Sequence, residues 1–159
     1  MSTLEVKGIQ APSGYDLVMP AGNIIQVVSL NKTSTQNGGY FLTTTATSFT
    51  ASTFSSTITP KFASSKIIVL VNTHLYSENA PSYLTIYRDS TNLGGSANGF
   101  IASTLLAGWK PINMHYLDSP STTSAITYKI YARALSGGTA YIGNDTDCFN
   151  VITLMEVAG

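Results

Sequence analysis

The sequence predicts an all-β fold, an antiparallel β-sandwich or jelly roll, and three observations support this prediction. Short apolar runs with period-2 alternation recur along the chain, separated by clusters of Gly, Pro, Asn, Asp and Ser. Thr, Tyr, Val and Ile are frequent, whereas the helix formers Glu and Lys are scarce. No long segment combines helical periodicity with the signals that start and stop a helix.

The first segment, residues 1–22, is predicted to be an arm that precedes the sandwich. Gly and Pro interrupt it too often for a long strand or helix. Its apolar residues are nevertheless too numerous for a solvated tail, so the segment is expected to dock on its own domain or on a neighbouring subunit. The apolar residues expected to attach the arm to a partner are Leu4, Val6, Ile9, Leu17 and Val18.

From residue 23 to residue 159 the chain is predicted to form one β-sandwich domain. The first strand covers 24–30 and is followed by the Asn-Gly-Gly turn at 37–39. A Thr-rich region with intermittent Phe anchors follows at 40–59. The run at 66–75 is nearly continuous in apolar residues, which is typical of a central strand covered on both faces.

The second half contains strands at 83–88, 112–117, 125–134 and 139–142. The second and third of these form a hairpin through a loop of Ser, Thr and Pro. In the third, Ile and Tyr at even positions alternate with Thr, Lys, Tyr and Arg at odd positions, so one face is predicted to be buried.

The closing strand, 150–157, has no polar face. One face can meet the core, and the other needs a cover, which sister copies of the chain would provide. Three-fold association of jelly rolls would place such strands near a shared axis, so a homotrimer is predicted. The residues predicted for the trimer interface are Val151, Ile152, Leu154, Met155 and Val157.

Composition excludes several partners. Only 10% of the 159 residues are charged, and the formal net charge is zero, so no basic patch is available for nucleic acid. No apolar run is long enough to cross a bilayer, and the first residues lack the layout of a signal peptide. Synthesis in a cytoplasm is expected, with exit only as part of a particle.

Catalytic and metal-binding patterns are weak, so no catalytic residue, metal ligand or cofactor is predicted. His74 and His115 lie in predicted strands without a second histidine at ligand spacing, which favours core or interface positions. A hydrolase would need one of them beside a carboxylate in an open cleft. Asp145 and Asp147 could bind calcium, and this possibility stays open, although the loop lacks a later bidentate Glu. Cys148, the single cysteine, is expected to be a buried thiol.

The aromatic residues support an alternative function. Rings in or beside loops could stack on sugar rings, with Trp109, Tyr76, Tyr83 and Tyr87 as the candidates. The competing interpretation is that tyrosines fill half-buried strand faces and subunit interfaces.

Four stretches carry a resemblance to a known family. Residues 117–128 (LDSPSTTSAITY), 86–91 (IYRDST), 65–71 (SKIIVLV) and 152–157 (ITLMEV) resemble the hairpin, strands and closing strand of a small β-sandwich module. Such modules occur in virion proteins of marine and cyanobacterial phages, and the likeness extends over about residues 24–159. Because each stretch alone is weak, the combination carries the resemblance.

This resemblance implies a trimeric jelly roll on a phage tail fibre or virion surface, with no catalytic residues to transfer. The short arm, in place of a long shaft, favours a short fibre, spike or capsid decoration protein. The leading hypothesis is a non-enzymatic virion structural protein, a homotrimer attached by its arm to capsid or tail proteins. The alternative is a module at a tail-fibre tip that recognises a host surface glycan.

Overall fold

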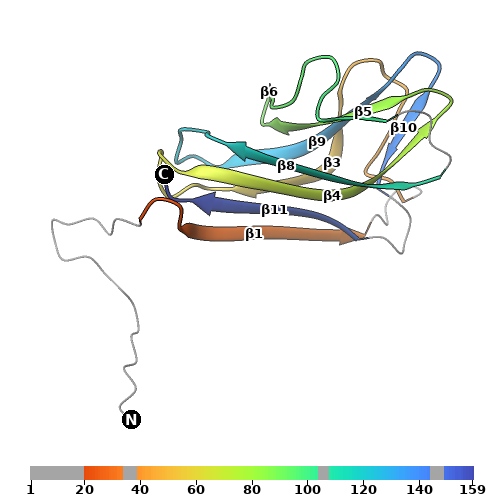
Figure 1. Cartoon of the computed structure of the whole chain (residues 1–159). Helices are drawn as coiled ribbons and strands as arrows, with labels where there is room; N and C mark the ends of the chain where they lie inside the picture. Colours follow the sequence, from red (N-terminus) through yellow and green to blue (C-terminus); the bar gives the residue numbers. More distant parts are fainter. Residues whose placement is uncertain (1–19, 34–38, 104–107, 144–148) are drawn as a thin grey trace, which may run out of the picture.

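The computed structural model describes residues 20–33, 39–103, 108–143 and 149–159, which form eleven strands and no helix (Figure 1). The strands are β1 (Ile24–Thr33), β2 (Leu42–Thr44), β3 (Thr50–Ile58), β4 (Lys66–Glu78), β5 (Ser82–Arg88), β6 (Thr91–Asn92), β7 (Ile101–Ser103), β8 (Lys110–Asp118), β9 (Ile126–Ala134), β10 (Thr139–Ile142) and β11 (Phe149–Val157). All pairings between them are antiparallel, and they make two sheets packed as a sandwich. The all-β sandwich prediction is confirmed.

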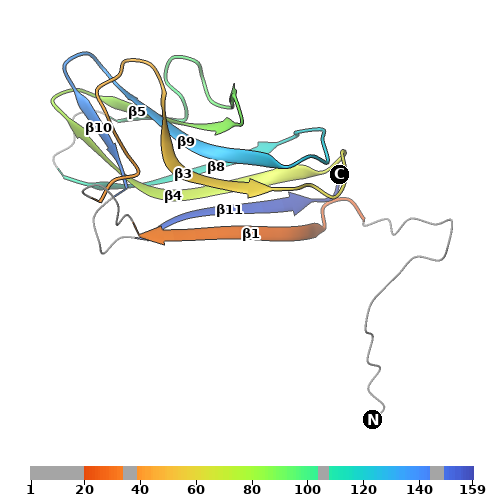
Figure 2. The same cartoon turned by 180° about the vertical axis from the view of Figure 1, so that it is seen from behind.

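The strand order is that of a jelly roll. In sheet A, β4 pairs with β11 along one edge and with β8 along the other, which gives the order β1-β11-β4-β8. In sheet B the order is β3-β9-β5, and β6 and β7 both pair with the free edge of β5. The long strands β3, β4, β5, β8, β9 and β11 alternate between the sheets along the chain. Figures 1 and 2 show the two layers from opposite sides.

Two rows of sheet A are interrupted at the same level. β11 and β10 follow each other along one edge of β4, with Val151 opposite Asn72 and Ile142 opposite Leu75. β1 and β2 follow each other in the adjoining row. β1 ends with Thr33 opposite Phe149 of β11, and β2 begins with Leu42 opposite Ile142 of β10. The 13-residue strand β4 therefore connects the two halves of the sheet.

The core lies between the two sheets. The even positions of β9 from Ile126 to Ala134 are all buried, while its odd positions are partly exposed, as the alternation predicts. The largest fully buried apolar side chains are Phe54, Ile58, Ile67, Leu75, Leu84, Ile86, Ile130, Ile142, Ile152 and Leu154. Both sheets contribute to this list, so the sandwich is stabilised mainly by apolar burial between its layers.

The central strand β4 differs from its prediction, because it is covered on one face only. Ile67, Val69 and Val71 are buried against sheet B, whereas Ile68 is half-buried and Leu70 is 38% exposed. Sheet B packs against one side of β4, and no other described element lies over its opposite side. The apolar run therefore supplies both a core face and an apolar outer face.

Two buried carboxylates are fixed by hydrogen bonds. Asp118 accepts two bonds from Arg88 Nη1, at 2.7 and 2.9 Å, and one from the Tyr128 hydroxyl at 2.7 Å. Burial and then the bond to Asp118 raise the pKa of Tyr128 far above its usual value. Glu156, also fully buried, accepts bonds from Gln26 and from the backbone amides of Lys61 and Phe62.

Candidate interaction surfaces

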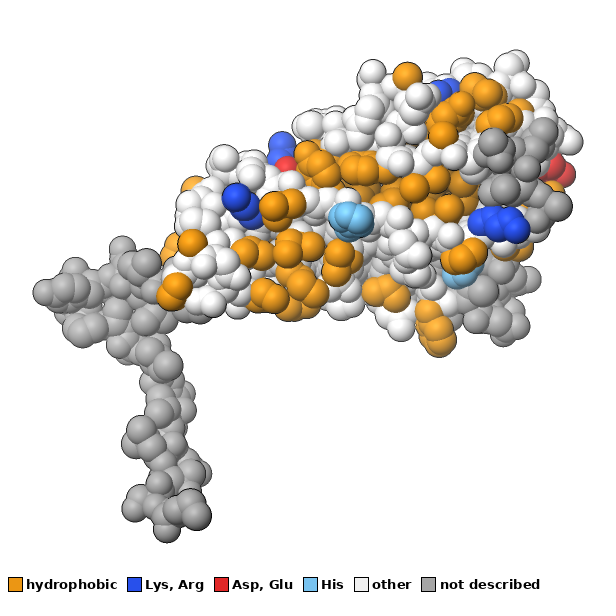
Figure 3. Space-filling view, viewed as in Figure 1, with side chains coloured by type: hydrophobic (Ala, Val, Ile, Leu, Met, Phe, Trp, Pro, Cys, Tyr) orange, Lys and Arg blue, Asp and Glu red, His pale blue; other side chains and the backbone are white. Residues whose placement is uncertain are grey.

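The outer face of sheet A carries an aliphatic row that crosses four strands. Val27 lies opposite Met155, Met155 opposite Ile68, and Ile68 opposite Leu117. We call the outward apolar side chains of this region the aliphatic face: Val27, Ile68, Leu70, Leu117, Val151, Met155 and Val157. Val27 and Leu117 are 53% and 54% exposed. Figure 3 shows hydrophobic side chains gathered over these strands.

The surroundings of the aliphatic face are polar, and one charged side chain, Lys66, lies opposite Val157 at its end. The neighbouring outward positions on the four strands are Ser29, Asn31, Asn72, Asn113, His115 and Thr153. A shallow hollow of about 200 Å³ lies among them, between Leu70, Asn72, His115 and Val151. An apolar surface with a polar border is typical of a protein–protein contact.

The structure divides the residues predicted for the trimer interface. Val151, Met155 and Val157 point outward on the aliphatic face, where an interface role stays a prediction. Ile152 and Leu154 are 0% exposed and pack in the core, so the prediction was wrong for these two. The reason is the strand's alternation, which sends consecutive residues to opposite faces of the sheet.

At the other end of sheet A, four rings form what we call the aromatic cluster: Tyr40, Tyr76, Trp109 and Tyr141. Tyr40 stacks on Trp109 at 5.4 Å between centroids, and Tyr76 stacks on Tyr141 at 5.4 Å. The two pairs meet edge-on or tilted, with centroids 5.1 to 6.4 Å apart. Each of the four residues is half-buried.

Four segments distant in the sequence position these rings. Tyr76 and Tyr141 face each other across the β4–β10 pair. Tyr40 precedes β2, which pairs with the other edge of β10, and Trp109 precedes β8 on the other edge of β4. The strand pairing of sheet A therefore gathers the cluster on its outer face.

A carboxylate borders the aromatic cluster. The Tyr141 hydroxyl donates a 2.9 Å hydrogen bond to Glu78 Oε2. This bond, with partial burial, raises the pKa of Tyr141 above its usual value. Thr43, opposite Tyr141 on β2, and Lys110, next to Trp109, are exposed. The cluster thus combines apolar ring surface with donors and acceptors at its edge.

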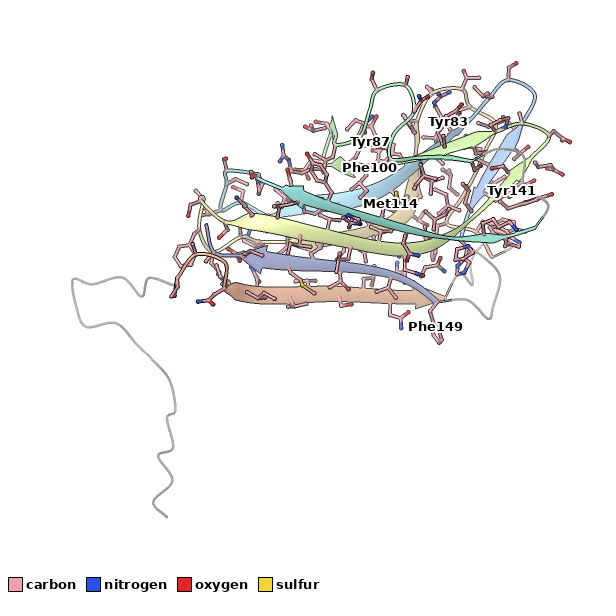
Figure 4. The ribbon with its side chains drawn as sticks, in the orientation of Figure 1. Tyr83, Tyr87, Phe100, Met114, Tyr141 and Phe149 are labelled. Carbon is pink, nitrogen blue, oxygen red and sulfur yellow. The ribbon has the colours of Figure 1, made fainter. Side chains whose placement is uncertain are left out.

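The structure brings together two of the four aromatic residues predicted for sugar stacking. The ring centroids of Trp109 and Tyr76 lie 5.6 Å apart in the aromatic cluster. Tyr83 and Tyr87 lie on β5 in sheet B (Figure 4), where Arg133 covers Tyr83 at 4.1 Å and Tyr131 stacks on Tyr87 at 3.8 Å. The four predicted residues therefore do not form one platform.

Sequence reasoning missed Tyr40 and Tyr141. A signal existed for Tyr141, because it occupies the outward position in an alternating strand. Its neighbours, however, depend on the pairing of β10 with β4 and β2, which sequence spacing does not determine.

Neither histidine is in the core. His115 is exposed and His74 is half-buried, both on β-strands of sheet A, so the core interpretation was wrong and the interface interpretation stays a prediction. Within the described ranges, no group of three or more His, Cys, Asp or Glu could hold a metal ion. The calcium candidates Asp145 and Asp147, Cys148, and the arm residues Leu4, Val6, Ile9, Leu17 and Val18 lie outside the described residues.

Among the described residues, no helix is long and apolar enough to cross a membrane. Comparison of the sequence with protein-family models gives no match, and comparison with curated proteins gives none either. The resemblance to phage virion modules therefore depends on the four strand sequences quoted above.

Proposed function

We propose that this protein is a non-enzymatic structural protein of a bacteriophage virion, a homotrimer whose copies bury the aliphatic face. The observation that carries the proposal is the outward-facing apolar row Val27–Met155–Ile68–Leu117 across sheet A, whose end residues Val27 and Leu117 are exposed. The resemblance of the strand sequences to phage modules supports the same function. By analogy alone, jelly rolls also recur in viral capsid domains.

A second copy of the chain is a suitable occupant of the aliphatic face. The row Val27–Met155–Ile68–Leu117 contains no charged side chain, and Lys66 lies beside it at one end of β4, opposite Val157. The centre of the face can therefore meet a second copy without opposing like charges. Closed cyclic symmetry would bury the face on every copy and leave no apolar patch exposed.

The arm is proposed to attach the trimer to a capsid or tail protein. The chain enters the sandwich beside its C-terminal end, because Gly22 N donates to Ala158 O and Ala158 N donates to Asn23 O, both at 2.8 Å. Residues 20–23 are thus joined to sheet A. The apolar residues before them would be held near one end of the sandwich, where a virion partner could bind them.

The test is the mass of the assembly in solution. Sedimentation of the full chain at micromolar concentration is expected to show a trimer. Leu70→Glu and Leu117→Glu each place a charge in the aliphatic face, and burying an unpaired charge is costly. Both variants are expected to sediment as folded monomers with circular dichroism spectra like that of the original chain.

The matched control is Leu135→Glu. Leu135 is 37% exposed, nearly the same as Leu70 at 38%, but it lies in the turn after β9. This variant is expected to remain trimeric. A monomeric original chain, or a trimer that survives both Leu70→Glu and Leu117→Glu, would contradict the proposal.

A further inference from the structure

We propose that the aromatic cluster of Tyr40, Tyr76, Trp109 and Tyr141 is a saccharide-binding platform, with Glu78 as its hydrogen-bonding edge. The proposal goes beyond assembly and does not depend on it. The two surfaces occupy different ends of sheet A and differ in chemistry: one is aliphatic, and the other is aromatic with hydroxyl groups.

The placement of the rings argues against a purely structural role. The residues that this region contributes to the core point inward, among them Leu75, Ala140 and Ile142, which are 0% exposed. The four rings lie on the opposite side of the sheet and are only half-buried. They therefore present aromatic surface to solvent in a part of the molecule where sandwich packing does not require it.

The arrangement matches the chemistry of a sugar ring. A pyranose presents flat C–H faces, which pack on aromatic rings, and equatorial hydroxyl groups at its edge, which need polar partners. The cluster contains two stacked pairs, each with an interplanar angle of 27°. A carboxylate can accept about four hydrogen bonds, and Tyr141 supplies one of them to Glu78 at 2.9 Å.

The same features argue against nucleic acid as the ligand. Nucleic-acid bases also stack on aromatic rings, but their phosphates need several cations. Here a carboxylate, Glu78, borders the rings and Lys110 is the adjacent cation. A proline-rich peptide would use aromatic rings as well, and it is one of the outcomes of the test below.

The cluster contains its own reporter, because Trp109 is the single tryptophan of the sequence. The Leu70→Glu variant, expected to be monomeric, and the original chain are both titrated with maltohexaose, cellohexaose and hexa-N-acetylchitohexaose while tryptophan fluorescence is recorded. We expect a saturable change with at least one hexasaccharide in both proteins, with a dissociation constant on the order of 0.1–1 mM.

Ring removal tests the location of the site. Tyr76→Ala is expected to weaken binding about tenfold, as loss of a stacking ring does in other aromatic platforms. Tyr141→Phe keeps the ring and removes the bond to Glu78, so its effect should be smaller. Tyr87→Ala removes a ring from the stacked pair with Tyr131 on sheet B and should leave the affinity unchanged.

Three results would overturn the proposal. One is the absence of a saturable response to all three hexasaccharides. Another is a fluorescence response to sugar that survives Tyr76→Ala. The third is a fluorescence response that saturates with a polyproline decamer and with none of the hexasaccharides. An original chain that is monomeric but binds a hexasaccharide would refute the assembly function alone. An original chain that is trimeric but binds none of the three would refute only the saccharide site.

Discussion

Gln26 and Glu156 stand directly opposite each other in the β1–β11 pair, and the Gln26 amide donates a 2.6 Å hydrogen bond to Glu156 Oε2. Gln26 also donates to the Thr59 carbonyl at 2.7 Å, and the amides of Lys61 and Phe62 donate to Glu156 Oε1. One buried carboxylate thus joins the edge strand β1 to the segment that connects β3 with β4.

Replacement of Glu156 by Ala is expected to destabilise the sandwich by about 3 kcal/mol, because three part-buried donors lose their acceptor together. Urea unfolding followed by circular dichroism measures the change. Glu156→Gln keeps one acceptor oxygen and most of the volume, so it should cost less. Equal losses for the two variants would mean that side-chain volume, and not hydrogen bonding, holds this region.

Acid should weaken the same contact. Burial alone would raise the pKa of Glu156, but hydrogen bonds from Gln26 and from the backbone amides of Lys61 and Phe62 lower it below the ordinary 4.5. A lowered folded-state pKa means that the carboxylate stabilises the fold above pH 4.5, and that this contribution is lost as the pH falls through the folded-state value. Unfolding free energies of the original chain and Glu156→Gln, measured across this range, are expected to converge in acid.

Alkali should act on Tyr128. Its folded-state pKa is raised by burial and by the hydrogen bond from its hydroxyl to Asp118. The stability that the protonated hydroxyl contributes is therefore complete below the ordinary pKa of 10.0 and is lost as the pH rises toward the folded-state pKa. Tyr128→Phe is expected to cost about 1–2 kcal/mol at neutral pH. In an ultraviolet titration, the phenolate signal of the folded original chain and of Tyr128→Phe should coincide until the chain unfolds.

Gly99 tests a backbone contact. It has a φ of +61°, and a Cβ added there would meet the Leu84 carbonyl oxygen. Gly99→Ala is therefore expected to cost about 3 kcal/mol or more. Gly137→Ala is the matched control, with a φ of +82° and open space around the added carbon, and should cost about 1–2 kcal/mol. Thermal unfolding compares them, and equal losses would exclude the steric contact as the cause.

Much of the fold could be predicted from the sequence, because a strand buried on one face leaves a period-2 pattern. The pattern in Ile126–Ala134 predicted both the strand and its buried side. It failed for Lys66–Leu75, which has apolar residues on both faces. Such a run looks the same in the sequence whether its outer face is covered by another layer or stays exposed. The same ambiguity placed Ile152 and Leu154 in the interface prediction.

The candidate sites were harder to predict, because they depend on pairings between distant strands. Trp109 and Tyr76 could be chosen as aromatic residues near loops, but Tyr40 and Tyr141 join them only through the register of β2, β10 and β4. No local pattern in a single sequence records that register. The choice of Tyr83 and Tyr87 failed for the same reason, since β5 belongs to the other sheet.

The shared interruption of two rows in sheet A has a consequence for hydrogen exchange. β2 and β10 connect to the rest of their sheet through the last residues of β4, while β11 is paired with neighbours along most of both edges. The short ladder can therefore open as a separate cooperative unit without breaking the long one. Amides of Ala140–Ile142 should exchange with deuterium sooner than those of Ile152–Glu156, and a ligand seated on the rings above them should slow that exchange.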